Sequence, residues 1–380
     1  MRLEPTMKQA VIRRTVRRFG QHRLAQAAVE MDTSGRFSDE VAQRMAELQY
    51  FGLEASDEYG GAGLDPISYA IVIEEVSRAN AAMGLCIAVH NGVAVYPLIN
   101  FGNEGQIGRF LQPMATGESI GTFCLTEPNA GSDPSSLETS AQKSGTGYLL
   151  NGNKVFVTNG GISKINLIFA AMNGSGTKRT FSVFLVESSR HGLLKGPQEE
   201  LMGMRGNPVC PISLHDCWVP EENLLGGEGR GLKVALETLN GGRIGIAAQS
   251  LGIAQACLDV SLKYAGERRQ FGRSISSFGA VQNMLADTAT RIEAARLLTY
   301  RACHFKASGG GSSAYSAMAK LNASETAVEA ARVAVQIHGG YGYTKAYPVE
   351  RYYRDAKVCE IYEGTSEVQR MVIARALLGR

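Results

Sequence analysis

The chain has 380 residues, of which 44% are hydrophobic and 20% are charged, with a formal net charge of +3. A chain of this length is too long for one compact hydrophobic core, so we expect a soluble globular protein with two or three domains. The small net charge argues against the basic field that nucleic-acid-binding proteins carry. The seven cysteines form no CxxC pair and the six histidines no HExxH motif. We therefore expect cysteines that remain thiols, and no metal site.

Residues 1–117 show the three- and four-residue spacing of apolar side chains that is typical of amphipathic helices. Ser38 is placed to cap a helix that reaches Phe51, and Asp65 followed by Pro66 is typical of the start of another helix. The apolar stretch from Ala81 to Phe101 is interrupted by polar residues and a proline, so its clean apolar length is below the roughly 20 residues of a membrane span. The sequence predicts a helical first domain in which this stretch is buried, without a membrane partner.

Residues 118–222 consist of short apolar runs separated by turn residues, which is typical of β-strands. The tripeptide from Asn151 to Asn153 lies between two such runs and predicts a hairpin turn. Residues 223–380 return to the helical period, in three segments long enough for bundle helices, Gly231–Ala265, Phe278–Ala307 and Ser312–Ile337. The sequence thus predicts an α+β protein in the order helices, strands, helices.

Two segments of the β region contain residues suited to a flat ligand. The run from Phe123 to Asp133 ends in small residues whose backbone can approach a ligand closely, and Thr126 and Ser132 add hydroxyl donors. Phe156 and Thr158 stand two residues apart on a predicted strand and would face the same side, one along a ring and the other at its edge. Each segment is about equally compatible with a ligand site and with an ordinary loop or core side chain.

Two segments of the helical region are suited to phosphate. Arg268 stands in the break between two long helices, where its guanidinium could bind a phosphate or simply face solvent. The glycines between Gln336 and Tyr343 let the backbone approach a phosphate. They follow no strand, so they are not a dinucleotide-binding fingerprint.

Glu363 is the residue of greatest chemical interest near the end of the chain. It precedes Gly364 and a predicted helix in which Ser366 and Gln369 have the spacing of a capping box. By itself it is compatible with a surface glutamate or with a carboxylate that projects into an apolar cleft.

Taken together and in this order, these segments resemble the acyl-CoA dehydrogenase family over the whole chain. The most specific pieces are Thr-Glu-Pro-x-Ala-Gly-Ser-Asp, Glu-Arg-x-Gln-Phe-Gly and Ile-Tyr-Glu-Gly-Thr-Ser-Glu-x-Gln-Arg. The resemblance implies an α+β multidomain fold with a helical N-terminal domain, a central β-barrel domain and a C-terminal four-helix bundle. It also implies FAD between barrel and bundle, and a homotetramer built as a dimer of dimers.

The resemblance assigns Glu363 as the catalytic base. The residues that it implies for cofactor binding are Phe123, Leu125, Thr126, Gly131, Ser132, Phe156, Val157, Thr158, Arg268, Phe271, Gln336, Ile337, Gly339, Gly340, Thr365, Ser366 and Glu367. Among these, Arg268, Phe271 and the run from Gln336 to Gly340 would bind the FAD of the neighbouring subunit. The substrate-binding residues that it implies are Ser132, Asn240, Arg243 and Gly364.

Three positions depart from the family pattern. Phe156 stands where the family usually has Trp, which keeps an aromatic face. Gly279 replaces a glutamine that often helps to bind FAD, and Asn240 stands where many relatives have Asp. One cofactor contact and one CoA contact therefore differ from the family expectation.

The activity that the resemblance implies is α,β-dehydrogenation of an acyl-CoA to the trans-2-enoyl-CoA, by α-proton abstraction at Glu363 and β-hydride transfer to FAD. Electrons would pass to an electron-transfer flavoprotein, in the bacterial cytoplasm or alternatively in the mitochondrial matrix. The short side chains of Gly241 and Gly242 favour short or branched acyl groups. An acyl-CoA oxidase that uses oxygen and a non-catalytic flavin-binding assembly factor on the same fold are the alternatives.

Overall fold

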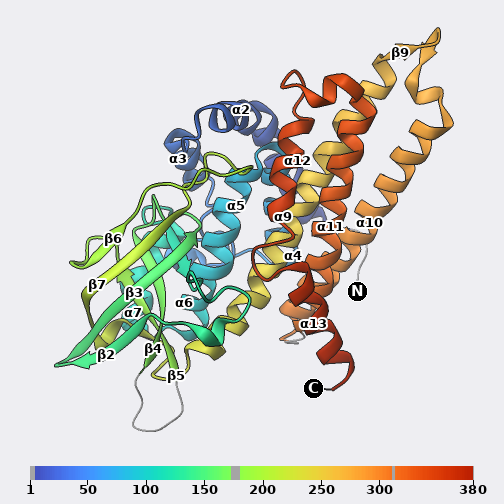
Figure 1. The fold of residues 1–380 in the computed structure, drawn as a ribbon. Coiled ribbons are helices and arrows are strands. Elements are labelled where there is room, and N and C mark those ends of the chain that lie inside the picture. The colour runs from blue at the N-terminus through green and yellow to red at the C-terminus, as the bar shows by residue number, and fades with distance from the viewer. Residues whose placement is uncertain (1–4, 173–179, 310–312, 380) are drawn as a thin grey trace.

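The computed structural model describes residues 5–172, 180–309 and 313–379. Figure 1 shows a strand-rich part beside a long helical bundle, with the N-terminal helices packed against both. This arrangement confirms the fold class that the sequence predicts.

The N-terminal part is helical, and π-helical turns join α1 to α2, α5 to α6 and α7 to α8. Its α-helices are α1 Met7–Phe19, α2 Ala25–Ser34, α3 Asp39–Glu47, α4 Pro66–Ala79, α5 Ala81–Val89, α6 Tyr96–Phe101, α7 Glu104–Gln106 and α8 Gln112–Ala115. The side chain of Asp65 accepts the amides of Ile67 and Ser68 at the start of α4, as the sequence predicts. Ser38 caps α3, but this helix ends at Glu47 and does not reach Phe51, because Gln49 adopts a left-handed backbone with φ 60°.

Two helices of the described residues are long and apolar enough to cross a membrane by length and composition alone. They are Ala81–Phe101 and Gly231–Glu267, and 89% and 83% of their most apolar windows are buried inside the protein. The first is thus the buried helix that the sequence predicts. Core helices of soluble proteins pass the same test, so these two helices are weak evidence of a membrane span.

The central part is an eight-stranded sheet with the strand order β6-β7-β3-β2-β4-β5-β8, in which β1 pairs in parallel with β4. The strands are β1 Gly121–Cys124, β2 Ser140–Ser144, β3 Gly147–Val157, β4 Ile165–Met172, β5 Thr180–Glu187, β6 Leu193–Lys195, β7 Cys210–Pro220 and β8 Leu224–Leu225. All eight residues of β4 are buried, and alternate residues belong to two different hydrophobic clusters, so this strand of the sheet is covered on both faces.

The predicted hairpin turn from Asn151 to Asn153 is wrong, because β3 continues through this tripeptide. The pairing with β7 shifts register between Leu150 and Gly152, where φ is 149°, so the tripeptide forms a β-bulge. A Cβ at position 152 would stand 2.5 Å from Oγ1 of Thr139, which explains the glycine. The Asn151 side chain pairs with the neighbouring strand, donating to the carboxylate of Asp216 over 3.0 Å.

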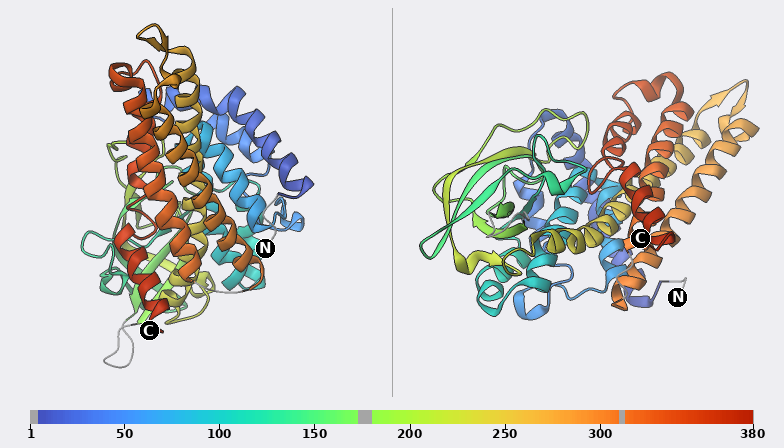
Figure 2. Two further views of the ribbon diagram at one scale, coloured as in Figure 1. Left: turned by 90° about the vertical axis from the view of Figure 1, so that its right-hand side faces the viewer. Right: turned by 60° about the horizontal axis from the view of Figure 1, so that its bottom comes forward.

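The C-terminal part is a bundle of long helices that run side by side (Figure 2). Its helices are α9 Gly231–Glu267, α10 Gly279–Ala307, α11 Ser313–His338, α12 Val349–Val358 and α13 Ser366–Leu377. Between α9 and α10 the chain forms a short hairpin, β9 Arg269–Gln270 and β10 Arg273–Ser274, which projects from one end of the bundle (Figure 1). Buried alanines dominate the inward face of α11, so its neighbours can approach closely.

Buried carboxylates of α4 hold the first helix in place. Glu74 and Glu75 have side chains that are only 1% exposed, and Arg13 of α1 pairs with both, over 3.1 and 2.9 Å. Arg17 of α1 adds a pair with Glu75 over 2.7 Å, and Arg296 of α10 one with Glu74 over 3.0 Å. This network connects α1, α4 and α10 through charges that must remain paired.

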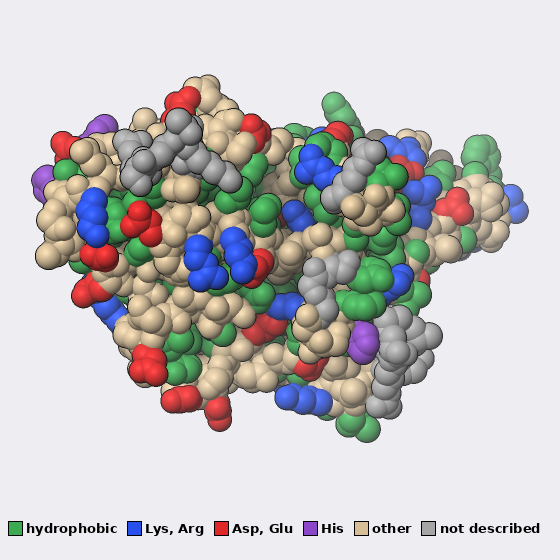
Figure 3. Space-filling model, turned by 90° about the horizontal axis from the view of Figure 1, so that it is seen from below, with side chains coloured by type: hydrophobic (Ala, Val, Ile, Leu, Met, Phe, Trp, Pro, Cys, Tyr) green, Lys and Arg blue, Asp and Glu red, His purple; other side chains and the backbone are tan. Residues whose placement is uncertain are grey.

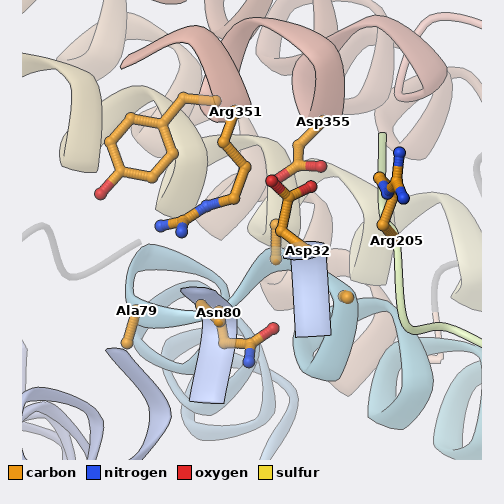
Figure 4. A pocket seen from close by; sticks show the side chains of 10 residues that line it. Asp32, Ala79, Asn80, Arg205, Arg351 and Asp355 are labelled. Carbon is orange, nitrogen blue, oxygen red and sulfur yellow. The ribbon is translucent and has the colours of Figure 1, made fainter. Parts of the chain in front are cut away.

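A small polar cavity of about 10 Å³ lies where α2, the loop before β7 and α12 meet. Figure 4 shows the carboxylates of Asp32 and Asp355 pointing toward each other there, with Arg351 nearby. Asp355 is buried and accepts the amide of Met204 over 2.5 Å. Burial raises the pKa of Asp355 to about 6, although Arg351 and the Met204 amide oppose this.

Figure 3 shows one face of the molecule, on which Lys and Arg side chains are interspersed with Asp and Glu. Neither sign of charge covers a large continuous region of this face, in keeping with the small net charge.

Candidate active site

Glu363 lies in the short loop between α12 and α13. The residue as a whole is half-buried, but its Oε2 atom is closed off from solvent and has no hydrogen-bond partner in the described part of the chain. Burial raises the pKa of this carboxyl to about 7, against the opposing effects of Arg243 and Lys320. A carboxylate in such a setting is a base suited to neutral pH.

Helix α9 provides the wall against which this carboxylate lies. A Cβ built on Gly242 would stand 2.5 Å from Oε2 of Glu363, so only glycine leaves room for this carboxylate at this position. The next residue, Arg243, is 5% exposed and donates from Nη1 to the Asn240 side chain over 2.9 Å. Burial lowers the pKa of Arg243, while Glu363 opposes this effect.

The backbone of the loop is bent into an uncommon conformation. Glu363 has φ 54° and Gly364 has φ 89°, so two successive residues are left-handed, and a non-glycine residue adopts this only when its surroundings enforce it. Gln369 donates from Nε2 to the carbonyls of Glu363 and Gly364, over 3.1 and 2.7 Å. Lys320 donates to the Gly364 carbonyl over 2.8 Å.

The helix that follows starts one residue earlier than a capping box at Ser366 would place it. Thr365 is the N-cap, and its hydroxyl accepts the amide of Val368 over 3.3 Å. Ser366 is then the first helical residue, with a buried hydroxyl that has no partner in the described part of the chain. Glu367 is exposed in the first turn, where a carboxylate is favourable for the helix dipole.

A cleft of about 300 Å³ opens beside this site. Its lining residues come from the end of the buried first-domain helix and from the bundle, and are Tyr96, Glu237, Asn240, Gly241, Ile244, Ala302, Phe305, Lys306, Gly309 and Ser316. Asn240 and Gly241 directly precede Gly242, which lies against the carboxylate of Glu363. Lys306 pairs with Glu54 over 2.6 Å, and its ammonium lies 4.8 Å from the ring centre of Tyr96, so one wall of the cleft is charged.

The β-domain residues singled out in the sequence lie together at the ends of β1 and β3. The amide of Val155 donates to the Thr126 carbonyl over 3.0 Å, which joins the loop after β1 to β3. Phe156 has φ 54° and is 66% exposed, at a second register shift of β3. Since the strand ends at Val157, Thr158 lies in the following loop, where its carbonyl accepts the hydroxyl of Thr122 over 2.5 Å.

This part of the structure fits a flat aromatic cofactor. An exposed phenylalanine held in a left-handed conformation leaves an apolar face uncovered that a planar ring could cover. Phe123 is half-buried, with its ring 4.6 Å from that of Phe169, whereas Val157 is 2% exposed and can offer only its backbone to a ligand. Gly131 and Ser132 are exposed in the loop nearby.

A second cleft, of about 550 Å³, lies at the end of the bundle that carries the β9–β10 hairpin. It is lined by residues that include Arg268, Ile337, Gly339 and Gly340. Phe271 on the hairpin is 93% exposed. Most of the residues that the resemblance assigns to a neighbouring subunit's cofactor therefore line one cleft, which does not include Glu363, while Phe271 and Gln336 are not among its lining residues.

The structure also places His338 and Gly279. His338 forms a hydrogen bond with the Ala334 carbonyl over 2.8 Å, and its ring stacks on that of Tyr264. A Cβ at Gly279 would contact nothing within 4 Å, so the missing glutamine leaves open space at the start of α10. No group of three or more His, Cys, Asp or Glu side chains suited to a metal is found within the residues described.

Sequence reasoning missed the buried lysines. Lys320 is 0% exposed on α11, next to the loop that contains Glu363. Lys154 is also 0% exposed, and pairs over 2.6 Å with Glu127 behind the Thr126 loop. Both stand among apolar neighbours in the sequence, and a single lysine on the apolar face of a helix or strand was the available signal.

The chain matches known family models over almost its whole length. The acyl-CoA dehydrogenase N-terminal domain matches residues 6–118, the middle domain residues 122–217 and the C-terminal domain residues 229–378. The chain is 44% identical to an acyl-CoA dehydrogenase of Bacillus subtilis, over 98% of this chain and 99% of that protein. It is 42% identical to a short-chain specific acyl-CoA dehydrogenase of Clostridium acetobutylicum, over 97% of each.

One similar solved structure concerns the electron transferring flavoprotein of Acidaminococcus fermentans and flavin-based electron bifurcation. A chain in it superposes with a TM-score of 0.97 at 43% identity, covering 100% of both chains. These matches show that the chain belongs to the acyl-CoA dehydrogenase family of FAD-dependent oxidoreductases.

Proposed function

We propose that this enzyme oxidises the Cα–Cβ bond of a short- or branched-chain acyl-CoA to the trans-2-enoyl-CoA, with Glu363 as the base that removes the α-proton. The observation that carries this proposal is the carboxylate of Glu363. Its Oε2 atom is closed off from water, has no partner in the described residues, and belongs to a carboxyl whose pKa burial raises to about 7. The α-proton of a thioester is weakly acidic, so an effective base needs this desolvation.

The protein contributes alignment as well as basicity. Gly242 leaves room for the carboxylate, while Gln369 and Lys320 bind the carbonyls of the loop behind it. The amide of Glu363 is the donor that we assign to the thioester carbonyl, where it would stabilise the developing enolate. Ser132, Asn240, Arg243 and Gly364 would hold the rest of the acyl-CoA in and beside the cleft next to α9.

We assign the FAD site to Phe123, Leu125, Thr126, the loop at Gly131 and Ser132, Phe156 to Thr158, and Thr365 to Glu367. The exposed face of Phe156 is the observation that supports this assignment. FAD, when bound, supplies the acceptor for the β-hydride. In a homotetramer, the cleft at Arg268, Phe271 and Gln336 to Gly340 would hold the distal part of the cofactor of a neighbouring subunit.

Short or branched substrates are favoured by two observations. One is the similarity to a short-chain specific dehydrogenase. The other is the modest cleft of about 300 Å³ whose lining includes Asn240 and Gly241. An electron-transfer flavoprotein is the electron acceptor that we propose, because a structure concerned with such a protein contains a similar chain. The bacterial relatives favour the cytoplasm as its compartment.

The decisive experiment mixes the FAD-loaded protein anaerobically with acyl-CoAs of different length and branching. The absorbance of the oxidised flavin is monitored during the reaction. We expect bleaching with short or branched acyl-CoAs, and none with the Glu363→Gln variant at equal FAD content. Retained bleaching in Glu363→Gln would remove Glu363 from the base role. Bleaching by no acyl-CoA would favour the assembly-factor alternative, and steady turnover with oxygen as the only acceptor would favour the oxidase.

A further inference from the structure

Lys320 is an unusual residue for the centre of a helical bundle. It lies on α11 and is 0% exposed, in a stretch where Ala317, Ala319 and Ala323 are also fully buried. No ion pair of its ammonium within 4.0 Å is found among the described residues, and its hydrogen bond goes to the Gly364 carbonyl. Burying an ammonium group without a paired carboxylate is costly, so a purely structural role would be met better by an apolar side chain.

The hydrogen bond alone does not explain the charge. The same Gly364 carbonyl also accepts the neutral amide of Gln369, over 2.7 Å, and Gln369 holds the Glu363 carbonyl as well. A neutral donor therefore already secures this loop. Lys320 adds a positive charge to this loop. Its ammonium binds the carbonyl of Gly364, the residue that directly follows Glu363.

We propose that Lys320 is a positioning residue for the base: it locks the left-handed bend at Glu363 and Gly364, and its charge favours the ionised carboxylate that burial otherwise disfavours. This inference rests on the proposed role of Glu363. It assigns to α11 a part in the reaction that does not involve contact with substrate or cofactor.

The charges around Glu363 support this division of labour. Arg243 faces it from α9 and Lys320 from α11, and both favour the ionised carboxylate. Tyr69 from α4 and Tyr362 from the loop itself also interact with it, and each has a pKa raised by burial, so each stays neutral. Arg243 is tied to Asn240 at the cleft, where substrate binds in our proposal. Lys320 lies behind the loop, where its charge acts whether or not substrate is present.

Burial lowers the pKa of Lys320 to about 8, while Cys359 and Glu363 oppose this. Lys320 is therefore still largely protonated near pH 7, where the base must act. Above pH 8 it would lose its charge, and with it the stabilisation of the carboxylate.

The test compares two variants that each remove one donor from the Gly364 carbonyl. Lys320→Met removes a donor and a charge, whereas Gln369→Met removes only a neutral donor. In FAD-loaded enzyme, we expect Lys320→Met to shift the ascending limb of the kcat/KM–pH profile upward by about one unit. At pH 6.5 its rate should therefore fall roughly tenfold. Gln369→Met should lower the rate without moving the profile.

A spectroscopic readout keeps the inference separate from the activity itself. Difference infrared spectroscopy can follow the carboxyl stretch of Glu363 against pH, with the band identified by its loss in Glu363→Gln. Lys320→Met should titrate at higher pH than the wild-type protein, even if no acyl-CoA proves to be a substrate. Titration at the wild-type pH in Lys320→Met would overturn the inference.

A second variant covers the case in which Lys320→Met does not fold or bind FAD. Lys320→Ala leaves a cavity that small amines can enter, so added ethylammonium should restore the pH profile of the wild-type enzyme. Tetramethylammonium should not restore the profile. It carries the same charge, but it cannot donate a hydrogen bond and is too wide for the space that a lysine side chain leaves. Equal effects of the two salts, or no rescue by either, would contradict a role for the Lys320 ammonium.

Discussion

Gly242 of α9 lies so close to the carboxylate of Glu363 that a Cβ at position 242 would stand 2.5 Å from Oε2 and 2.8 Å from Cγ1 of Val93. A methyl group there must displace the base, because neither neighbour is far enough away to accommodate it. We expect Gly242→Ala to lower kcat by about a hundredfold, since a displacement of about 1 Å spoils the alignment of a catalytic group. Single-turnover flavin reduction, at equal FAD content, measures this effect.

Gly241→Ala is the matched control for that substitution. A Cβ at Gly241 would stand 3.6 Å from the Gly92 carbonyl oxygen, an ordinary contact, and Glu363 is not among its nearest neighbours. The change in helix propensity is the same in the two variants. Gly241→Ala can alter KM because it lines the cleft, but its kcat should stay within a few-fold of wild type. Equal losses of kcat in both variants would contradict the proposed contact.

The raised pKa of Glu363 also predicts a cost in stability. Burial raises this pKa from 4.5 to about 7, so the folded state binds the proton more tightly than the unfolded state. The contribution of this carboxyl to the stability of the folded protein is therefore greatest below pH 4.5, and it is lost as pH rises through about 7. The difference corresponds to roughly 3 kcal/mol. Glu363→Gln should therefore melt at a higher temperature than wild type at pH 8, and at a similar temperature at pH 5. Parallel melting curves across this range would show that the carboxylate is not destabilising.

Local signals in the sequence were reliable where the interaction is local. Asp65 caps α4 because its acceptor is two and three residues from the donors, and the long helices follow from the period of their apolar residues. The tripeptide Asn151 to Asn153 misled because its conformation is set by a distant neighbour. Thr139 leaves no space for a side chain at position 152, and β7 pairs with both halves of the strand.

The candidate site likewise has one part that the sequence could predict and one part that it could not. The place of Glu363 could be assigned from its motif, through the resemblance to a family. Its environment could not, because the groups that surround it come from three separate elements, with Gly242 on α9, Lys320 on α11 and Tyr69 on α4. A buried lysine has no sequence pattern that reveals which carbonyl it binds, and the depth of burial that shifts a pKa arises only on packing.

Asp355 offers a second test of pH-dependent stability, away from the active site. Burial raises its pKa from 3.8 to about 6, with Asp32 acting in the same direction and Arg351 and Arg354 against it. The stability linked to its protonated form is lost as pH rises from 3.8 through about 6. Asp355→Asn keeps an acceptor for the Met204 amide, so it should be at least as stable as wild type at pH 7.5. Relative to wild type, its free energy of unfolding should gain roughly 2.5 kcal/mol between pH 4 and pH 7.5.

Asp32→Asn is the control of opposite sign. Burial acts against ionisation of Asp32, but its hydrogen bonds with Arg354, over 2.7 Å, prevail and lower its pKa below the usual value. Ionised Asp32 therefore stabilises the folded protein at pH values above the unfolded pKa of the carboxyl, and this stabilisation is lost as pH falls. Asp32→Asn should therefore destabilise the protein at pH 7.5 and have less effect near pH 3. If both variants shift stability in the same direction at pH 7.5, the assigned charge states are wrong.

The ion network of α4 predicts which surface-facing arginine matters for stability. Arg13 is 21% exposed and pairs with Glu74 and Glu75, whose side chains are 1% exposed, whereas Arg44 and its partner Glu47 are 59% and 50% exposed. Arg13→Met leaves buried carboxylates short of a partner, and we expect a loss of about 3 kcal/mol in the free energy of unfolding. Arg44→Met removes an equally short ion pair that water already screens, and should cost less than about 1 kcal/mol. Urea denaturation of the FAD-loaded protein measures both, and similar losses in the two variants would mean that α1 is not held by these charges.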